Sequence, residues 1–156
     1  MSLSTFLSPD ATLSHWQAHR RLTRRVIEAF PDDKLFTFSI GGMRSFGEMC
    51  NEFLAMTVPM TAGTVDGQWG SYQGGTARTK AELLTAWDAD TARLAELWPK
   101  IPAAHFADTV TAFGSYTGKL HDLFLYVIDN EIHHRGQGYV YLRALGIEPP
   151  PFYERG

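Results

Sequence analysis

Cysteine is almost absent from this sequence: Cys50 is the only one among 156 residues. An intramolecular disulfide needs two cysteines and a Cys-rich zinc site needs several, so both are excluded. Cys50 follows Met49 inside a segment with helical apolar spacing. We therefore interpret it as a packing residue rather than a nucleophile.

Positive charge and long apolar runs are also scarce. The chain carries 14 Lys and Arg against 17 Asp and Glu, a formal net charge of −3 that argues against a nucleic-acid partner. No run of about 18 apolar residues occurs, so neither a transmembrane helix nor a membrane partner is expected. The opening residues MSLSTFLSPDATL lack the basic and apolar regions of a secretory signal, and the expected location is cytoplasmic.

Familiar catalytic motifs are missing as well. The sequence contains no G-x-S-x-G nucleophile elbow, no Walker-type phosphate loop and no His-Glu-x-x-His zinc motif. Candidate functional residues must therefore be sought among single side chains on the predicted helices.

What is present fits one globular domain spanning residues 1–156. Hydrophobic residues make up 44% of the chain and aromatic residues 13%, which is enough for a sizeable core. Four segments place apolar residues three or four positions apart, and no internal repeat or linker separates them. The sequence therefore predicts a single all-α domain, a four-helix bundle.

The first two helices have recognisable boundaries. The first is expected to begin near Asp10 and to end at Pro31. The second is expected to begin with a capping box formed by Ser45 and Glu48, and to be ended by Pro59 and the Gly/Thr-rich stretch that follows it.

The last two helices are delimited in the same way. Thr79 and Glu82 form a second expected capping box, and Pro99 ends the third helix. The fourth helix is the longest, and Gly146 suits its C-terminal end. The segment DTVTAF before it, residues 108–113, is expected to be extended.

The longest expected loop is TAGTVDGQWGSYQGGTART, residues 61–79. Loops of this length in compact domains are often functional. Trp69 and Tyr72 within it are candidates to cover a cleft.

Two polar groups on the first helix are interpreted as surface features. His15 and His19 lie one turn apart, but the arginines beside them favour a surface position over shared metal ligation. The arginines fall mostly opposite the apolar residues and are expected to form a solvated face. They are Arg20, Arg21, Arg24 and Arg25.

The last helix carries the most distinctive polar residues, in the stretch DNEIHHRGQG. Because a helix turns about 100° per residue, His134 falls in the middle of the apolar face and is expected to point into the bundle. Asn130 and Glu131 flank that face. His133 points away from it, toward the surface or a subunit contact.

Two interpretations of His134 follow from the residues alone. A buried histidine needs partners for its ring nitrogens, which Glu131, Gln137 or a neighbouring helix could supply. Alternatively, Glu131 and His134 have the Glu-x-x-His spacing with which helical bundles hold metal ions.

The stretch HHRGQGYVYLRALGIEPPPFYE, with three preceding helical segments in matching order, resembles the DinB/YfiT-like superfamily. The resemblance implies a four-helix bundle with a crossover connection between antiparallel pairs, commonly assembled as a homodimer. It also implies a cleft in which typical members hold a divalent metal through three histidines, one on the second helix and two as His-x-x-x-His on the last. Some members transfer thiols to electrophiles, and others resemble hydrolases or isomerases.

This chain departs from that ligand set. His134 matches the last histidine of the family motif, but Asn130 stands where its partner belongs. The second-helix ligand falls on Glu52, or on Asn51 if the register is displaced by one residue. Glu131 is an alternative third ligand, and Glu52, Glu131 and His134 together would suit Mn or Fe better than Ni or Zn.

Two functional hypotheses result. In the first, the protein is a transferase or hydrolase that uses one divalent ion (Mn, Fe, Ni or Zn) on a small-molecule substrate, with Arg135 or Gln137 orienting the site. In the second, the metal has been lost, and Glu52, Asn130 and His134 form a hydrogen-bonded cluster. The protein then binds a small molecule, for example a stress-related one, or serves as a structural homodimer.

Overall fold

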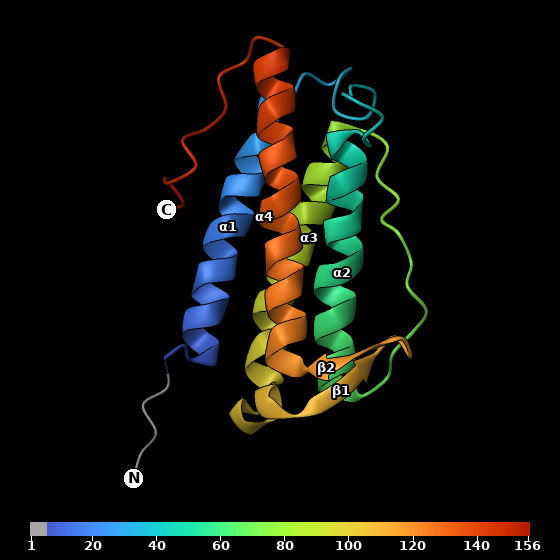
Figure 1. The fold of residues 1–156 in the computed structure, drawn as a ribbon, viewed down its shortest axis with the longest axis vertical. Coiled ribbons are helices and arrows are strands. Elements are labelled where there is room, and N and C mark those ends of the chain that lie inside the picture. The colour runs from blue at the N-terminus through green and yellow to red at the C-terminus, as the bar shows by residue number, and fades with distance from the viewer. Residues whose placement is uncertain (1–5) are drawn as a thin grey trace.

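The computed structural model describes residues 6–156, so the first five residues of the stretch examined for a secretory signal lie outside the described residues. Four long helices form a bundle (Figure 1). They are α1 (Pro9–Ala29), α2 (Phe46–Asp66), α3 (Lys80–Leu97) and α4 (Leu120–Ala144). The predicted all-α four-helix bundle is confirmed.

The connections set the order of the helices in the bundle. α1 packs against α3 and α4, and α2 packs against the same two helices. α2 and α3 run in the same direction, because residues 67–79 travel back along the outside of α2 before α3 begins (Figure 1). This segment is the crossover connection that the family resemblance implies.

Short elements occupy the connection between α3 and α4. They are the 3-10 helices η1 (Trp98–Lys100) and η2 (Ala103–Ala107) and the strands β1 (Thr109–Ala112) and β2 (Tyr116–Lys119). The strands pair antiparallel with Thr109 opposite Lys119, and β1 matches the expected extended piece. Within residues 6–156, no helix combines the length and hydropathy needed to cross a membrane.

Local hydrogen bonds explain several helix boundaries. The Ser45 hydroxyl accepts from the Glu48 N–H at 3.3 Å, and the Glu48 carboxylate accepts from the Ser45 N–H at 3.0 Å, so the predicted capping box is present. Thr79 accepts from the Glu82 N–H at 3.1 Å and caps α3, but the Glu82 carboxylate accepts from the Arg78 N–H at 2.8 Å and not from Thr79, so the second expected capping box is incomplete. Gly146 follows α4 with φ +77°, a left-handed conformation that favours glycine.

Two expected boundaries are wrong. The N-cap of α1 is Ser8 rather than Asp10. α2 continues through Pro59 and ends at Gly67, where φ is +72°. A proline inside a helix costs about 3 kcal/mol, but the helix on both sides of it stays packed in the core, with Met60 only 3% exposed. Tertiary packing therefore outweighs the local helix-breaking signal.

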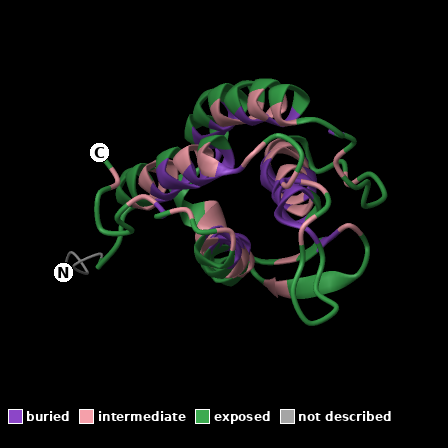
Figure 2. Ribbon diagram, turned by 90° about the horizontal axis from the view of Figure 1, so that it is seen from above, coloured by how far each residue is buried: buried purple, intermediate pink, exposed green. Residues whose placement is uncertain are grey.

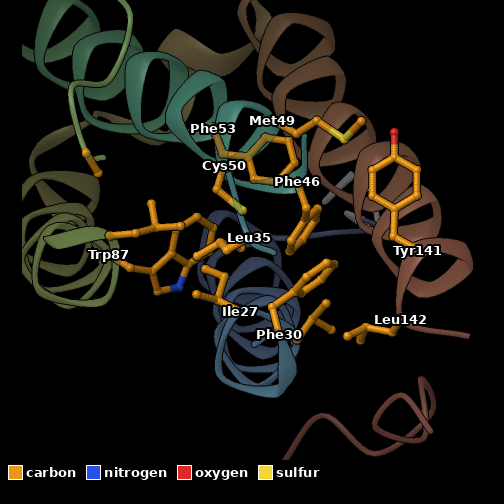
Figure 3. Packing of buried hydrophobic residues seen from close by; sticks show 13 residues of the cluster. Ile27, Phe30, Leu35, Phe46, Met49, Cys50, Phe53, Trp87, Tyr141 and Leu142 are labelled. Carbon is orange, nitrogen blue, oxygen red and sulfur yellow. The ribbon is translucent and has the colours of Figure 1, made fainter. Parts of the chain in front are cut away.

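Two adjoining hydrophobic clusters fill the interior, and the buried faces of the helices turn toward each other (Figure 2). In the first, Cys50 is fully buried beside Phe53 and Trp87 (Figure 3), as expected of a packing residue. The second contains Trp16 and Trp98, whose ring centroids lie 5.9 Å apart in a T-shaped arrangement. Aromatic packing therefore extends along the bundle.

Two α1 residues expected at the surface are buried instead. Arg20 is 0% exposed and His19 is 4% exposed. The reason is position, because Arg20 follows the buried Trp16 by four residues and so lies on the same inner stripe. Arg20 donates to Asp90 at 2.9 Å and its guanidinium stacks 4.0 Å from the Trp87 ring centroid. The charged side chain of Arg20 can lie inside the bundle because Asp90 and Trp87 of α3 interact with it.

Candidate functional site

Glu52 from α2 and Asn130 and His134 from α4 meet between the two helices. The Asn130 side-chain amide donates to Glu52 Oε1 at 3.0 Å, and His134 Nε2 lies 3.5 Å from the same oxygen. The Asn130 amide also lies 3.4 Å from the sulfur of Met56. The structure thus brings together the three residues that the sequence analysis named as candidate ligands.

A fourth residue, Arg44, completes this cluster and was not a candidate on the basis of the sequence. Its guanidinium donates to Glu52 Oε2 at 2.5 Å and lies 3.5 Å from His134 Nε2. Arg44 directly precedes the N-cap Ser45, and its carbonyl accepts from the Tyr141 hydroxyl at 2.8 Å, so its backbone is held at the start of α2. Adjacency to a strong helix cap was the only signal for it in the sequence.

The charge of Glu52 is stabilised inside this cluster. Burial by itself would raise the pKa of the Glu52 carboxyl, but hydrogen bonds from Arg44 and Asn130 outweigh burial and lower it below its ordinary value. Glu52 is therefore an anion paired with a guanidinium. We name Arg44, Glu52, Asn130 and His134 the Glu52 cluster.

Gln137 orients the imidazole of His134. His134 Nδ1 lies 2.6 Å from the Gln137 side-chain oxygen, which can only accept, so Nδ1 carries the proton. The other ring nitrogen, Nε2, then faces Arg44 and Glu52. Phe53 supports this orientation, because its ring stacks on the imidazole with centroids 6.0 Å apart. Of the two predicted cleft residues, Gln137 lies at the site.

The other predicted cleft residue, Arg135, lies elsewhere. Its guanidinium donates to the His19 carbonyl at 3.1 Å and to the Thr23 hydroxyl at 3.3 Å, both on α1. Arg135 is 5% exposed, so it faces the bundle interior toward α1 and not the Glu52 cluster.

Glu131, the alternative metal ligand, also faces away from the Glu52 cluster. It is 2% exposed and lies 3.8 Å from Arg20 of α1. The buried residues of α4 centre on Glu131, about 60° around the helix from His134, so the middle of the inner face is not where the sequence analysis put it. Within residues 6–156, no group of three His, Cys, Asp or Glu side chains is placed to hold a metal.

A pocket of about 490 Å³ opens beside the Glu52 cluster. α2, the segment before it and the 67–79 crossover form its walls. The lining residues are Phe36, Arg44, Glu48, Asn51, Glu52, Tyr72, Gly74, Gly75 and Arg78. The pocket and the Glu52 cluster therefore share Arg44 and Glu52, and Tyr72 of the expected long loop is part of the wall.

Asn51, the alternative second-helix ligand, holds the crossover segment in place. Its side-chain amide donates to the Ala77 carbonyl at 2.9 Å, and its side-chain oxygen accepts from the Ala77 N–H at 3.2 Å. The Asn51 carbonyl accepts from the Gly75 N–H at 3.1 Å. Asn51 thus builds the pocket wall, while Glu52 is the residue that faces His134.

Gly75→Ala should loosen this wall. A Cβ at position 75 would lie 2.7 Å from the Asn51 carbonyl oxygen, so the segment must shift. We expect a loss of about 1–3 kcal/mol in the free energy of unfolding, with faster amide hydrogen exchange at Ala77. Gly74→Ala is the matched control, because a Cβ there meets nothing within 4 Å, and its stability should change by less than about 0.5 kcal/mol. Equal effects of the two changes would contradict the role of Asn51.

The Glu52 cluster does not fit a divalent metal of the three-histidine kind. It offers one carboxylate and one imidazole, and the Asn130 amide already donates to Glu52. The Arg44 guanidinium also contacts Glu52 and lies 3.5 Å from Nε2 of His134. A metal ion would sit beside this guanidinium, and like unit charges at about 4 Å repel by on the order of 4 kcal/mol near a protein surface.

Comparisons with known proteins match this chain to one family and to solved structures of the same fold. A family model described as the DinB family matches residues 1–156. A DinB-like protein from Bacillus subtilis (YjoA) superposes with a TM-score of 0.75 at 19% identity, covering 93% of this chain and 99% of that one. A DinB-like protein from Bacillus cereus superposes with a TM-score of 0.73 at 16% identity, covering 96% and 100%. No curated protein matches the chain.

Proposed function

This chain belongs to the DinB family, and we propose that it binds a small molecule in the pocket beside the Glu52 cluster without using a divalent metal. The observation that carries the proposal is the position of Arg44. Its guanidinium forms an ion pair with Glu52 and approaches His134 Nε2, so a side-chain cation occupies the place that a metal would need.

The pocket supports binding of a small organic molecule. Its volume of about 490 Å³ lies within the range of roughly 300–1,000 Å³ that is usual for ligand sites. Phe36 and Tyr72 offer apolar and aromatic surface, and Arg78 and Glu52 offer charge of both signs. A ligand with both an apolar part and a polar group matches these walls.

The metal content of the purified protein tests the first half of the proposal. We expect substoichiometric metal, and no thermal stabilisation by Mn²⁺, Fe²⁺, Ni²⁺ or Zn²⁺, because an ion that does not bind the folded state cannot stabilise it. Arg44→Met should create weak stabilisation by these ions, since it exposes Glu52 and His134. Arg78→Met, which removes a guanidinium from the same pocket but not from the cluster, should not.

The competing function is a metal-dependent transferase or hydrolase, and the meeting of Glu52, Asn130 and His134 favours it. It requires Arg44 to leave the cluster when the ion enters. Stoichiometric metal in the unmodified protein, lost on Glu52→Ala or His134→Ala, would establish this alternative and overturn the metal-free proposal.

Ligand capture tests the second half. Native mass spectrometry of the metal-free protein, followed by denaturation, should reveal a small molecule that stays with the folded chain. Tyr72→Ala should reduce its retention, because Tyr72 lines the pocket and its side chain is about half exposed. Retention unchanged by Tyr72→Ala and Arg78→Met would place the molecule outside this pocket.

Two further expectations remain predictions. The homodimer implied by the family resemblance can be measured by light scattering against the chain mass of 17.5 kDa. The cytoplasmic location can be measured by fractionation of cells that express the protein at its native level.

A further inference from the structure

The arginines of α1 divide into two pairs with different surroundings. Arg20 pairs with Asp90, and Arg24 pairs with Glu28 and Asp88. Arg21 and Arg25 instead face the C-terminal segment, residues 147–156, which lies beside α1 (Figure 1). Within residues 6–156, neither of these two arginines has a carboxylate at ion-pair distance.

Backbone carbonyls are the acceptors that Arg21 and Arg25 do find. Arg21 Nε donates to the carbonyl of Arg155 at 3.2 Å, and Arg25 donates to the carbonyl of Glu154. Arg25 Nε is buried, and it has no hydrogen-bond partner in the described part of the chain. A buried guanidinium N–H without an acceptor is costly, so this donor calls for an additional acceptor.

His19 lies between two further guanidinium groups. Arg135 approaches its Nδ1 at 3.0 Å, and Arg155 approaches its Nε2 at 3.0 Å. A neutral imidazole has only one nitrogen that can accept, and arginine can only donate. In one of these two contacts an arginine N–H therefore faces the N–H of the imidazole and forms no hydrogen bond. Burial, together with the charges of Arg135, His15 and Arg155, lowers the pKa of His19 to about 3, so the ring is neutral and does not balance the charge of the arginines.

Four guanidinium groups thus converge on the junction of α1, α4 and the C-terminal segment. They are Arg21, Arg25, Arg135 and Arg155, which we name the arginine junction. Among the described residues, none of the four has a carboxylate at ion-pair distance, although the charge of Glu131 acts on Arg135 from further away. Multiple guanidinium forks without anions are the usual arrangement for recognition of phosphate, which carries close to two negative charges and several acceptor oxygens.

We propose that the arginine junction binds a phosphate group, free or carried on a small molecule. This site is distinct from the pocket of the proposed function, because the pocket lies along α2 and the 67–79 crossover while the arginine junction lies where α1 meets the C-terminal segment (Figure 1). The phosphate oxygens would accept from the guanidinium groups of Arg21, Arg25 and Arg155. Arg135 is buried next to His19 and would add positive charge near the phosphate without donating to it.

Titration with inorganic phosphate, in a background of sodium chloride at matched ionic strength, tests the proposal. We expect saturable binding by calorimetry and a thermal stabilisation that chloride does not reproduce. Arg25→Gln and Arg155→Gln should each weaken binding by about tenfold or more, because charge-assisted hydrogen bonds to phosphate are lost. Arg143→Gln is the matched control: it removes one positive charge from an exposed position at the end of α4 and should leave binding unchanged.

A second readout does not depend on the stability of the variants. Bound phosphate would offset the neighbouring positive charges, so the NMR titration of His19 should move to higher pH when phosphate is present. Tighter binding of a phosphomonoester than of inorganic phosphate would identify a phosphorylated small molecule as the ligand, and equal binding would identify the free ion. Absence of saturable binding, or equal binding by folded Arg25→Gln, Arg155→Gln and unmodified protein, would overturn the proposal.

Discussion

Replacing Arg20 with methionine should lower the free energy of unfolding by about 3–5 kcal/mol, the usual cost of removing one partner from a buried ion pair. Arg20 is 0% exposed and bonds to Asp90 and Thr57, and it lies 3.8 Å from Glu131. Without the guanidinium, two buried acidic groups in the bundle lose their nearest positive charge. Chemical denaturation monitored by circular dichroism measures the change.

Arg24→Met is the matched control for Arg20→Met. Arg24 lies one turn further along the same helix and is also paired with acidic side chains, but its side chain is 34% exposed. Exposed pairs contribute about 0–1 kcal/mol, so this variant should be nearly as stable as the unmodified protein. A loss below 1 kcal/mol for Arg20→Met would show that the buried network does not hold α1 and α3 together.

Glu131→Gln should remove a large part of the pH dependence of stability near neutrality. Both carboxylate oxygens of Glu131 are buried without a hydrogen-bond partner in the described residues, and Arg20 at 3.8 Å is too distant for a hydrogen bond. Burial raises the pKa of Glu131 to about 7 from an ordinary value of 4.5, although Arg20 and Arg135 partly oppose it. The folded protein therefore prefers the protonated acid.

The sign of the effect follows from linkage. Because the pKa of Glu131 is higher in the folded state than in the unfolded state, its contribution is most favourable below pH 4.5 and becomes unfavourable as pH rises toward 7. The difference in the pKa of Glu131 between the folded and unfolded states corresponds to about 3 kcal/mol in the free energy of unfolding. At pH 8, Glu131→Gln should thus be more stable than the unmodified protein, and at pH 4.5 the advantage should disappear.

The stability difference between the two proteins, and not either curve alone, is the quantity to measure. Burial also raises the pKa of Asp90, to about 6, and His19 contributes a slope of opposite sign, because its lowered pKa makes it destabilising as pH falls from 6.5 toward 3. Infrared absorption of protonated carboxyl groups at pH 6 reports the same titration directly, and it should be weaker in Glu131→Gln, which keeps only the contribution of Asp90. A difference that does not vary with pH would refute the protonated form of Glu131.

The candidate site was only partly accessible from the sequence. Glu52 on α2 is 78 residues before Asn130 on α4 and further still from His134, and only the resemblance to a family motif related these residues. The sequence showed that Asn130 stands where the family motif has a histidine. Arg44 was not, because its importance depends on the distance between the start of α2 and the middle of α4, which no local pattern encodes.

Helix interiors show the same division. The helical spacing of α4 predicted His134 at the centre of the inner face, but Glu131 lies there. The sequence could not show this, because a buried glutamate with an arginine partner on α1 has the same residue type as a glutamate on the surface. Arg20 was misplaced for the same reason. Polarity is a guide to burial only where no neighbouring helix supplies a partner of opposite charge.

The sequence by itself determined the helical character of the chain, the caps at Ser45, Thr79 and Gly146, and the family to which the bundle belongs. These features depend on residues within about four positions of each other or on a contiguous motif. Only the tertiary structure decided that α2 continues past Pro59, that Arg20 is buried, and that Arg44 lies beside Glu52 and His134, where a metal ion would bind. Each of these is settled by contacts between helices, whose free energies exceed the local preferences that a sequence displays.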